Sequence, residues 1–160
     1  MMEKSSVLFL CSGNSARSQM AEALLRHTAG ERFEAHSAGM DPRGVHPLTH
    51  RVLGEVGIDS SGLRSKSVKE FLGKRSIQVA IILCEQARQG CPSLYPFALR
   101  VLYWPFEDPV APELEREELL ERFRAVRDSI GEHLQRWCAE ERGAAPERGR
   151  RALPIDDESL

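Results

Sequence analysis

The fold of this chain is decided by residues 7–22, which read Val7-Leu8-Phe9-Leu10-Cys11-Ser12-Gly13-Asn14-Ser15-Ala16-Arg17-Ser18-Gln19-Met20-Ala21-Glu22. A short apolar run followed by Ser, Gly and Asn and then by helix formers predicts a buried strand, a tight turn and a helix. Backbone N–H groups in such a turn can point inward and form a concave site for a tetrahedral oxyanion. Cys11 would lie at the floor of this site and Arg17 beside it. The arrangement favours an anion site over the plainer alternative, a small buried Cys at the end of a strand.

The side chains of this loop have complementary expected roles. The inward N–H groups and the Arg17 guanidinium favour the thiolate form of Cys11, which is the nucleophilic form. Arg17 presents a planar fork suited to two oxygens of the anion. Ser18 is expected to cap the following helix and to donate its hydroxyl to the sulfur. The predicted oxyanion-binding residues are Ser12, Gly13, Asn14, Ser15, Ala16 and Arg17.

Length and composition limit the classes of protein to which this chain can belong. A chain of 160 residues with 41% hydrophobic residues fits one domain with one core. The formal net charge of -2 argues against nucleic acid as a partner. No apolar run approaches the ~20 residues of a membrane span or the core of a signal peptide, so we expect a cytoplasmic protein without membrane contact. In that compartment the four cysteines are expected to be reactive or buried, and not a disulfide framework.

Strand and helix signals alternate along the chain. Strands are expected at 5–10, 33–38, 77–83 and 99–103, and helices at 18–29, 46–56 and 113–140, with a short helix from Ser67 to near Gly73. This order predicts a single α/β domain over residues 1–140, with a four-stranded parallel sheet, helices on both faces and flavodoxin-like winding. Residues 141–160 lack any period and predict a mobile C-terminal tail. Ligands bind beyond the carboxyl ends of such strands, and the residues expected there are Cys11, Ser37, Cys84 and Asp108.

Asp108-Pro109, in the loop after the last strand, is the candidate general acid. A thiolate that attacks a tetrahedral oxyanion must expel hydroxide or alkoxide, and a positioned acid accelerates that step by about 10²–10⁴-fold. Asp-Pro is also an ordinary turn sequence. Alone, the dipeptide favours the plain turn. The strand-end position of Asp108, together with the family resemblance described next, favours the acid.

The stretch from Cys11 to Arg17-Ser18 resembles the signature loop of the low-molecular-weight protein tyrosine phosphatase superfamily. The run from Ser18 to Glu22 is similar to its arsenate reductase branch, and the resemblance covers residues 6 to about 138. It implies a low-molecular-weight phosphatase-like fold, an Asp-Pro acid loop and arsenate as substrate, with phosphate or sulfate as competing anions. The loop departs from both branches at Ala16, where they commonly carry a second Cys.

Cys84 and Cys91 resemble the resolving pair of thioredoxin-coupled arsenate reductases. The resemblance implies that Cys11 forms an adduct with arsenate, that a disulfide passes from Cys11–Cys84 to Cys84–Cys91, and that thioredoxin is the final reductant. Residues 85–89 are helix formers, and seven helical steps of ~1.5 Å would separate the two Cα atoms by about 10 Å. A disulfide spans at most ~7 Å, so we expect this segment to unwind when the bond forms.

No metal site is expected. Zinc ligands are typically separated by about two to four residues, unlike Cys84 and Cys91. His46 and His50 have helical spacing without the Glu of a metalloprotease motif and are expected to be surface or packing residues, and Cys138 to be structural. By the resemblance, Asn14, Glu22 and Ser37 shape the loop and help to hold a monovalent cation. An acidic ligand of that cation falls at Lys66 here, whose ammonium can occupy the site itself, so no tightly bound cofactor is expected.

Two other functions remain open at this point. A low-molecular-weight protein tyrosine phosphatase hydrolysing phosphate monoesters would share every loop residue. That branch usually walls its pocket with aromatic residues, whereas residues 40–48 contain none and Val110 follows Pro109; this favours a small inorganic anion. A phosphate-sensing module is the third possibility. We expect a monomer that reduces arsenate.

Overall fold

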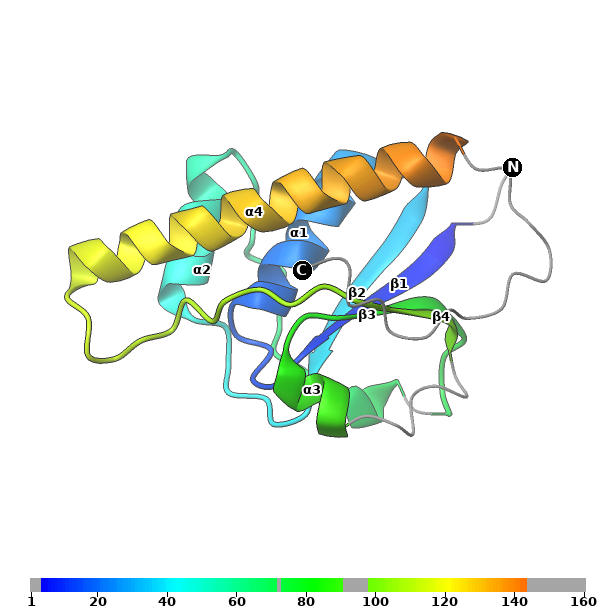
Figure 1. Ribbon diagram of the computed structural model, residues 1–160, viewed down its shortest axis with the longest axis horizontal. Coiled ribbons are helices and arrows are strands. Elements are labelled where there is room, and N and C mark those ends of the chain that lie inside the picture. Colours follow the sequence, from blue (N-terminus) through cyan, green and yellow to red (C-terminus); the bar gives the residue numbers. More distant parts are fainter. Residues whose placement is uncertain (1–3, 72, 91–97, 144–160) are drawn as a thin grey trace.

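One parallel sheet organises the structure, a computed structural model that describes residues 4–71, 73–90 and 98–143. Its strands are β1 (Ser5–Cys11), β2 (Phe33–Gly39), β3 (Ile77–Ile82) and β4 (Ala98–Tyr103), in the spatial order β2-β1-β3-β4 (Figure 1). This is flavodoxin-like winding, in which the chain leaves β1 first to one side and then to the other. The predicted four-stranded parallel α/β fold is confirmed.

Three helices lie on one face of the sheet: α1 (Arg17–Ala29), α2 (Pro47–Glu55) and α4 (Arg116–Gly143). The ring of Phe33, on β2, lies 5.0 Å from that of Trp137, on α4. Arg100, on β4, forms an ion pair with Glu141 of the same helix. The C-terminal turns of α4 therefore contact both edge strands, β2 and β4.

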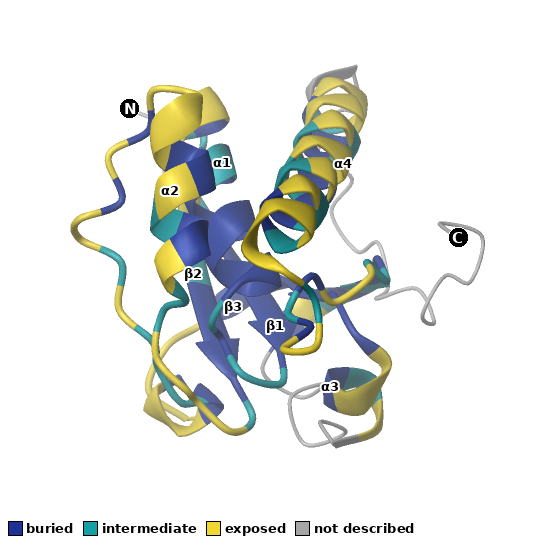
Figure 2. Ribbon diagram, turned by 90° about the vertical axis from the view of Figure 1, so that its left-hand side faces the viewer, coloured by how far each residue is buried: buried dark blue, intermediate teal, exposed yellow. Residues whose placement is uncertain are grey.

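The opposite face carries a 3-10 turn, η1 (Val68–Glu70), and the short helix α3 (Glu85–Gly90). Phe71, directly after η1, packs its ring 5.5 Å from that of His36 on β2. The Tyr103 hydroxyl on β4 donates to Glu85 at 2.9 Å. Helices on both faces are thus confirmed, and β1 and β3 are buried between them (Figure 2). Burial on both faces explains why these two strands are almost continuously apolar.

The long helix α4 is shifted relative to the predicted range of 113–140. Residues 111–114 form a turn instead, closed by the Leu114 N–H donating to the Ala111 carbonyl at 3.0 Å. The first bond of the helix register runs from the Leu119 N–H to the Glu115 carbonyl. At the other end α4 continues to Gly143, so residues 141–143 of the predicted tail are helical. The rest of that tail, 144–160, lies outside the described residues. Across the ranges the structure describes, no helix is long and apolar enough to span a bilayer.

Candidate active site

Cys11 ends β1 and lies at the floor of a loop of residues 11–18, here named the Cys11 loop. Its side chain is buried, with 2% of the residue exposed. Its Sγ lies 2.7 Å from the Ser18 hydroxyl and accepts the Asn14 N–H at 3.3 Å. The candidate nucleophile therefore has two polar neighbours on its sulfur.

The carbonyls of the Cys11 loop point outward, toward the segment that follows β2. That segment donates backbone N–H groups to the carbonyls of Cys11, Ser12, Gly13 and Ser15, from Met40, Asp41, Arg43 and His46 respectively, over 2.8–3.2 Å. In a trans peptide the carbonyl and the next N–H point in opposite directions. The N–H groups of Ser12, Gly13, Asn14 and Ala16 therefore point inward, as the Asn14 bond to sulfur shows directly. The backbone donors thus have the inward orientation that the sequence predicts for an anion site.

Asn14 fixes the geometry of the loop. Its φ of 47° lies in the left-handed region, which Asn tolerates better than most residues. Its side-chain amide donates to the hydroxyls of Ser18 at 2.8 Å and Ser37 at 3.0 Å. Because Asn14 supplies the donor to the Ser18 oxygen, the Ser18 hydrogen is free to point at the sulfur. The Cys11 sulfur can therefore receive two hydrogen bonds, from the Ser18 hydroxyl and the Asn14 N–H.

Ser18 does not cap α1, contrary to expectation. The cap position is Ala16, which makes no side-chain capping bond, and the helix begins at Arg17. Ser18 lies inside the first turn, where its hydroxyl is engaged by Cys11 and Asn14.

A buried polar network extends behind the loop. Ser37 donates to Glu22 Oε1 at 2.7 Å, and Glu22 pairs with Arg26 at 3.0 Å and with Lys66 at 3.5 Å. The structure thus brings together the three residues expected to shape the loop. It also adds Gln19, which donates to the Asn14 and Arg64 carbonyls at 3.1 and 2.9 Å. The sequence around Gln19 does not indicate this role, because its partner Arg64 lies far along the chain.

Gly39, the last residue of β2, is where the sheet touches the loop. A Cβ added there would lie 2.7 Å from the Ser12 carbonyl oxygen and 2.9 Å from the Asn14 backbone nitrogen. Both are backbone atoms that cannot move aside individually. The close approach of β2 to the Cys11 loop therefore requires glycine.

Arg17 and Asp108 face each other at the mouth of the site. The Arg17 guanidinium is buried, donates to the Phe106 carbonyl at 3.1 Å and lies 3.5 Å from Asp108 Oδ2. The other oxygen, Asp108 Oδ1, accepts the Val110 N–H at 3.0 Å. Asp108 thus makes the turn that Asp-Pro suggests and also directs a half-exposed carboxyl oxygen at the anion-binding guanidinium.

Arg122, on α4, ties the Asp108 loop (residues 104–110) to the body of the protein. Its guanidinium donates to the Asp108 carbonyl at 3.0 Å and to Glu107 at 2.8 Å. The sequence does not indicate this contact, because it joins a loop to a helix that follows it.

The two histidines expected to be surface or packing residues, His46 and His50, make local contacts. His46 caps α2 by accepting the Leu48 N–H on Nδ1 at 3.0 Å, and its ring lies 4.8 Å from that of Phe123. Burial lowers the pKa of His46, while the nearby Asp108 charge raises it. The His50 Nδ1 lies 2.6 Å from the Ser60 hydroxyl. Within the described residues no cluster of three or more His, Cys, Asp or Glu can hold a metal ion.

Cys84 lies next to Cys11 at the carboxyl edge of the sheet. Leu10 pairs with Ile82, and the Leu83 N–H donates to the Leu10 carbonyl at 2.8 Å, so the two cysteines follow adjacent strands. Cys84 is buried, and its Sγ accepts the Ala87 N–H at 3.4 Å at the start of α3. The helical geometry expected for 85–89 is present as α3. Cys91 lies outside the described residues; Cys11 and Cys84 are free thiols.

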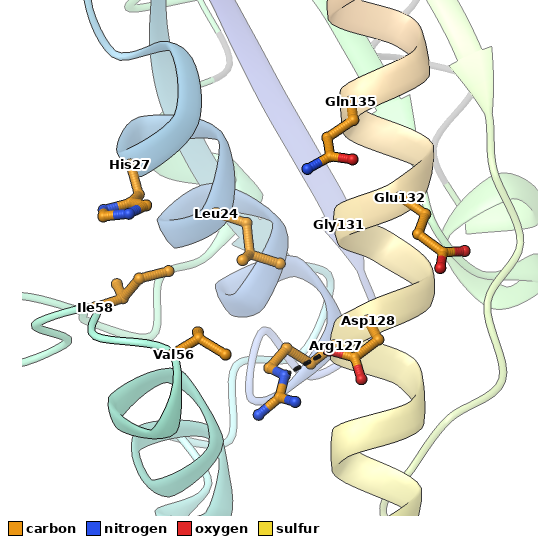
Figure 3. Close-up of a pocket in the computed structure, with 9 residues that line it drawn as sticks. All are labelled: Leu24, His27, Val56, Ile58, Arg127, Asp128, Gly131, Glu132 and Gln135. Atoms are coloured by element: carbon orange, nitrogen blue, oxygen red, sulfur yellow. Dashed lines mark hydrogen bonds and ion pairs between the residues drawn. The ribbon is translucent and has the colours of Figure 1, made fainter.

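A separate groove lies away from the Cys11 loop. It measures about 370 Å³ and lies between α1, α4 and the segment after α2 (Figure 3). Leu24, Val56 and Ile58 form its apolar wall, and Arg127 and Glu132 lie opposite. None of the predicted site residues lines it, so the candidate chemistry belongs to the Cys11 loop.

Comparisons with known proteins agree with this geometry. An arsenate reductase from Bacillus cereus is 37% identical over 137 residues, which cover 86% of this chain and 96% of that protein. A solved arsenate reductase in the phosphate binding state superposes with a TM-score of 0.70 at 31% identity, covering 85% of this chain and 98% of the other. A low molecular weight protein tyrosine phosphatase from T. tengcongensis gives a TM-score of 0.70 at 25% identity, covering 86% and 99%. Residues 6–144 match the family described as low molecular weight phosphotyrosine protein phosphatase, and the chain belongs to that family.

Proposed function

We propose that this protein is an arsenate reductase in which Cys11 attacks arsenate and Cys84 and Cys91 pass the resulting disulfide to thioredoxin. The observation that carries the proposal is the β1–β3 register: Cys11 ends β1, Leu10 pairs with Ile82, and Cys84 follows two residues after the end of the adjacent strand β3. Neighbouring parallel strands are about 4.8 Å apart, a separation that a disulfide can bridge. A hydrolase has no use for a second thiol at this position.

In the first step the Cys11 thiolate attacks arsenic(V), and an S–As bond replaces an As–O bond. The inward N–H groups and Arg17 hold the remaining oxygens. The departing oxygen leaves as water if Asp108, in its protonated form, supplies the proton. Anion binding at Arg17 replaces its ion pair with Asp108, which frees the carboxyl for this role.

In the second step the Cys84 thiolate attacks the Cys11 sulfur. The S–As electron pair moves to arsenic, which leaves as arsenite in the +3 state, and a Cys11–Cys84 disulfide forms. The two electrons gained by arsenic equal the two lost by the thiols. The free thiols of the two described cysteines supply the reducing equivalents.

In the third step Cys91 attacks Cys84, which releases the Cys11 thiolate and leaves a Cys84–Cys91 disulfide for thioredoxin to reduce. The helix α3 occupies residues 85–90 between the two cysteines, and seven helical steps of ~1.5 Å would separate their Cα atoms by about 10 Å. The step therefore requires α3 to unwind. Such a cycle also needs a reducing compartment, which favours the cytoplasm.

The second candidate is hydrolysis of phosphate monoesters, because Cys11, Arg17 and Asp108 would serve a phosphate as well as an arsenate. In that mechanism water attacks the thiol-phosphate intermediate, and neither Cys84 nor Cys91 takes part. We favour reduction because Cys84 adjoins Cys11.

The test supplies arsenate with thioredoxin, thioredoxin reductase and NADPH, and follows NADPH oxidation and arsenite. Cys11→Ser, Cys84→Ser and Cys91→Ser should each abolish turnover, and Cys91→Ser should still release one arsenite per protein. Cys138→Ser, which alters the buried cysteine of α4, is the matched control and should turn over normally. Normal para-nitrophenyl phosphate hydrolysis by Cys84→Ser and Cys91→Ser, with no arsenite from the wild type, would establish the phosphatase instead.

The unwinding of α3 has its own readout. Limited proteolysis should cut within residues 85–91 in the oxidised Cys11→Ser variant, in which Cys84 and Cys91 can still pair, and spare them in its reduced form. Equal cutting of both forms would contradict the unwinding.

A further inference from the structure

We propose that Lys66 is a positioning residue whose ammonium takes the place of a monovalent cation behind the Cys11 loop, so that this protein orders its loop without one. The proposal concerns the loop itself. It therefore holds whether the loop serves reduction or hydrolysis.

The Lys66 ammonium lies among oxygen atoms. Its Nζ donates to the Arg64 carbonyl at 2.7 Å and lies 3.5 Å from Glu22 Oε1. Only 12% of the Lys66 side chain and 5% of the Glu22 side chain are exposed. A carbonyl and a carboxylate oxygen are ligands that a hard cation also prefers, and here the charge is supplied by the chain.

The remaining oxygens of this region already have donors. Glu22 Oε1 accepts the Ser37 hydroxyl, and Asn14 Oδ1 accepts the Lys66 N–H at 2.7 Å and the Gln19 amide at 2.9 Å. A cation would have to displace these donors beside a resident ammonium, against like-charge repulsion in a poorly solvated site. The residues present therefore do not fit a bound monovalent cation.

The ammonium is connected to the nucleophile by consecutive hydrogen bonds. Lys66 orients Glu22, which holds the Ser37 hydroxyl at 2.7 Å. Ser37 and Ser18 accept the two amide hydrogens of Asn14, and Ser18 contacts the Cys11 sulfur at 2.7 Å. Without the Lys66 ammonium, Glu22 would keep only the more exposed Arg26 as a cationic partner. The Oε1 that accepts the Ser37 hydroxyl would then be less firmly held, and so would Ser18 against the sulfur.

The electrostatics agree with this role. Burial lowers the pKa of Lys66, and the Glu22 charge opposes that effect. Arg26 also pairs with Glu22, at 3.0 Å, but 55% of its side chain is exposed. Lys66 is therefore the less solvated of the two cations on this carboxylate.

The test compares wild type, Lys66→Met and Lys66→Asp in potassium, sodium and tetramethylammonium chloride at equal ionic strength. We measure thermal unfolding, turnover and the pH profile of Cys11 alkylation by iodoacetamide. The alkylation is measured in a background in which the other three cysteines are replaced by Ser. Lys69→Met is the matched control, because Lys69 is exposed on the adjacent η1 turn.

We expect the wild type and Lys69→Met to give the same results in all three salts. Lys66→Met should lose about tenfold in kcat with little change in KM, and its alkylation profile should move to higher pH. Lys66→Asp, which adds a carboxylate, should regain thermal stability and kcat specifically in potassium or sodium. A merely structural lysine would change the unfolding temperature and leave the alkylation profile in place.

Two results would overturn the proposal. One is a wild-type protein that potassium stabilises above tetramethylammonium, since a cation would then bind despite Lys66. The other is a Lys66→Met variant with wild-type alkylation in tetramethylammonium. The wild-type salt comparison needs no variant, so the proposal stays testable if Lys66→Met fails to fold.

Discussion

The Cys11 loop and the helix α3 lie at the same edge of the sheet but are anchored differently. The loop is held by buried polar groups, among them Ser18, Ser37 and Glu22. The described contacts of α3 include surface groups: Glu85 and Arg88, with 54% and 35% of their side chains exposed. A buried network holds its members in one geometry, whereas solvated contacts are easily exchanged for water. The difference agrees with the mechanism we propose, in which the Cys11 loop stays fixed and α3 unwinds.

The largest expected effect comes from filling the space that the Cys11 loop occupies. Gly39→Ala places a Cβ within 3 Å of Ser12 and Asn14 backbone atoms, so the loop must shift. We expect turnover to fall by about 10²-fold or more, because a displacement of 1 Å is enough to misplace the reacting groups. The free energy of unfolding should fall by about 1–3 kcal/mol.

Gly54→Ala is the control for this change. Gly54 lies on α2 with open space around its Cβ position, so alanine should be neutral or stabilise by up to about 1 kcal/mol. Steady-state turnover and urea unfolding measure both variants. Near-normal turnover of Gly39→Ala would show that the loop is not rigid.

The second prediction removes one donor from the sulfur. Ser18→Ala should lower turnover by about 10- to 100-fold, as expected for loss of a hydrogen bond to a charged atom. It also leaves an Asn14 amide hydrogen buried and unpaired, which costs about 1–3 kcal/mol of stability. The pH profile of Cys11 alkylation by iodoacetamide should move to higher pH in Ser18→Ala. The control is Ser61→Ala, an exposed serine, which should give the wild-type profile.

The sequence predicts those parts of the site that are local in the chain. The strand, turn and helix of residues 7–22, the left-handed Asn14 and the turn at Asp108 follow from patterns a few residues long. The hydrogen bonds from the segment after β2, the Gln19 bond to Arg64 and the Arg122 anchor join distant residues, and no local pattern encodes them. The predicted Ser18 cap was wrong because the sulfur and Asn14 engage that hydroxyl. The family resemblance, and not the spacing, indicated Glu22 and Ser37.

The third prediction concerns the Asp108 loop. Its anchoring side chain is less buried than the network of the Cys11 loop and less exposed than the Glu85 side chain of α3. Arg122 holds it from α4, with about a third of its side chain exposed. Arg122→Met should lower kcat by about three- to tenfold through a less well positioned acid, consistent with the modest free energy of a partly solvated ion pair. KM for arsenate should stay unchanged, because Arg17 still binds the anion. Arg116 is exposed at the start of the same helix, so Arg116→Met should leave kcat unchanged. A lower kcat in both variants would mean that changes to α4, and not loss of the Asp108 loop contact, reduce turnover.

The smallest effect should be a pH dependence of α3. The hydrogen bond from Tyr103 and then that from Gln89 lower the pKa of Glu85 below its ordinary value of 4.5. At pH values above 4.5, the charged Glu85 side chain therefore helps to anchor α3. This anchoring is lost when the pH falls through the lowered pKa and the carboxylate becomes protonated.

Hydrogen exchange can detect this loss. On acidification from pH 7 to below pH 4, protection of the Arg88 amide should fall about two- to fivefold relative to the Met20 amide, after correction for intrinsic exchange. Both amides donate to backbone carbonyls, of Cys84 and Ala16, but Met20 lies in the buried first turns of α1. Glu85→Gln should make the ratio independent of pH, because the side chain no longer titrates. Equal acid sensitivity of the two amides would mean that α3 opens together with the Cys11 loop, and the contrast between the two regions would then be lost.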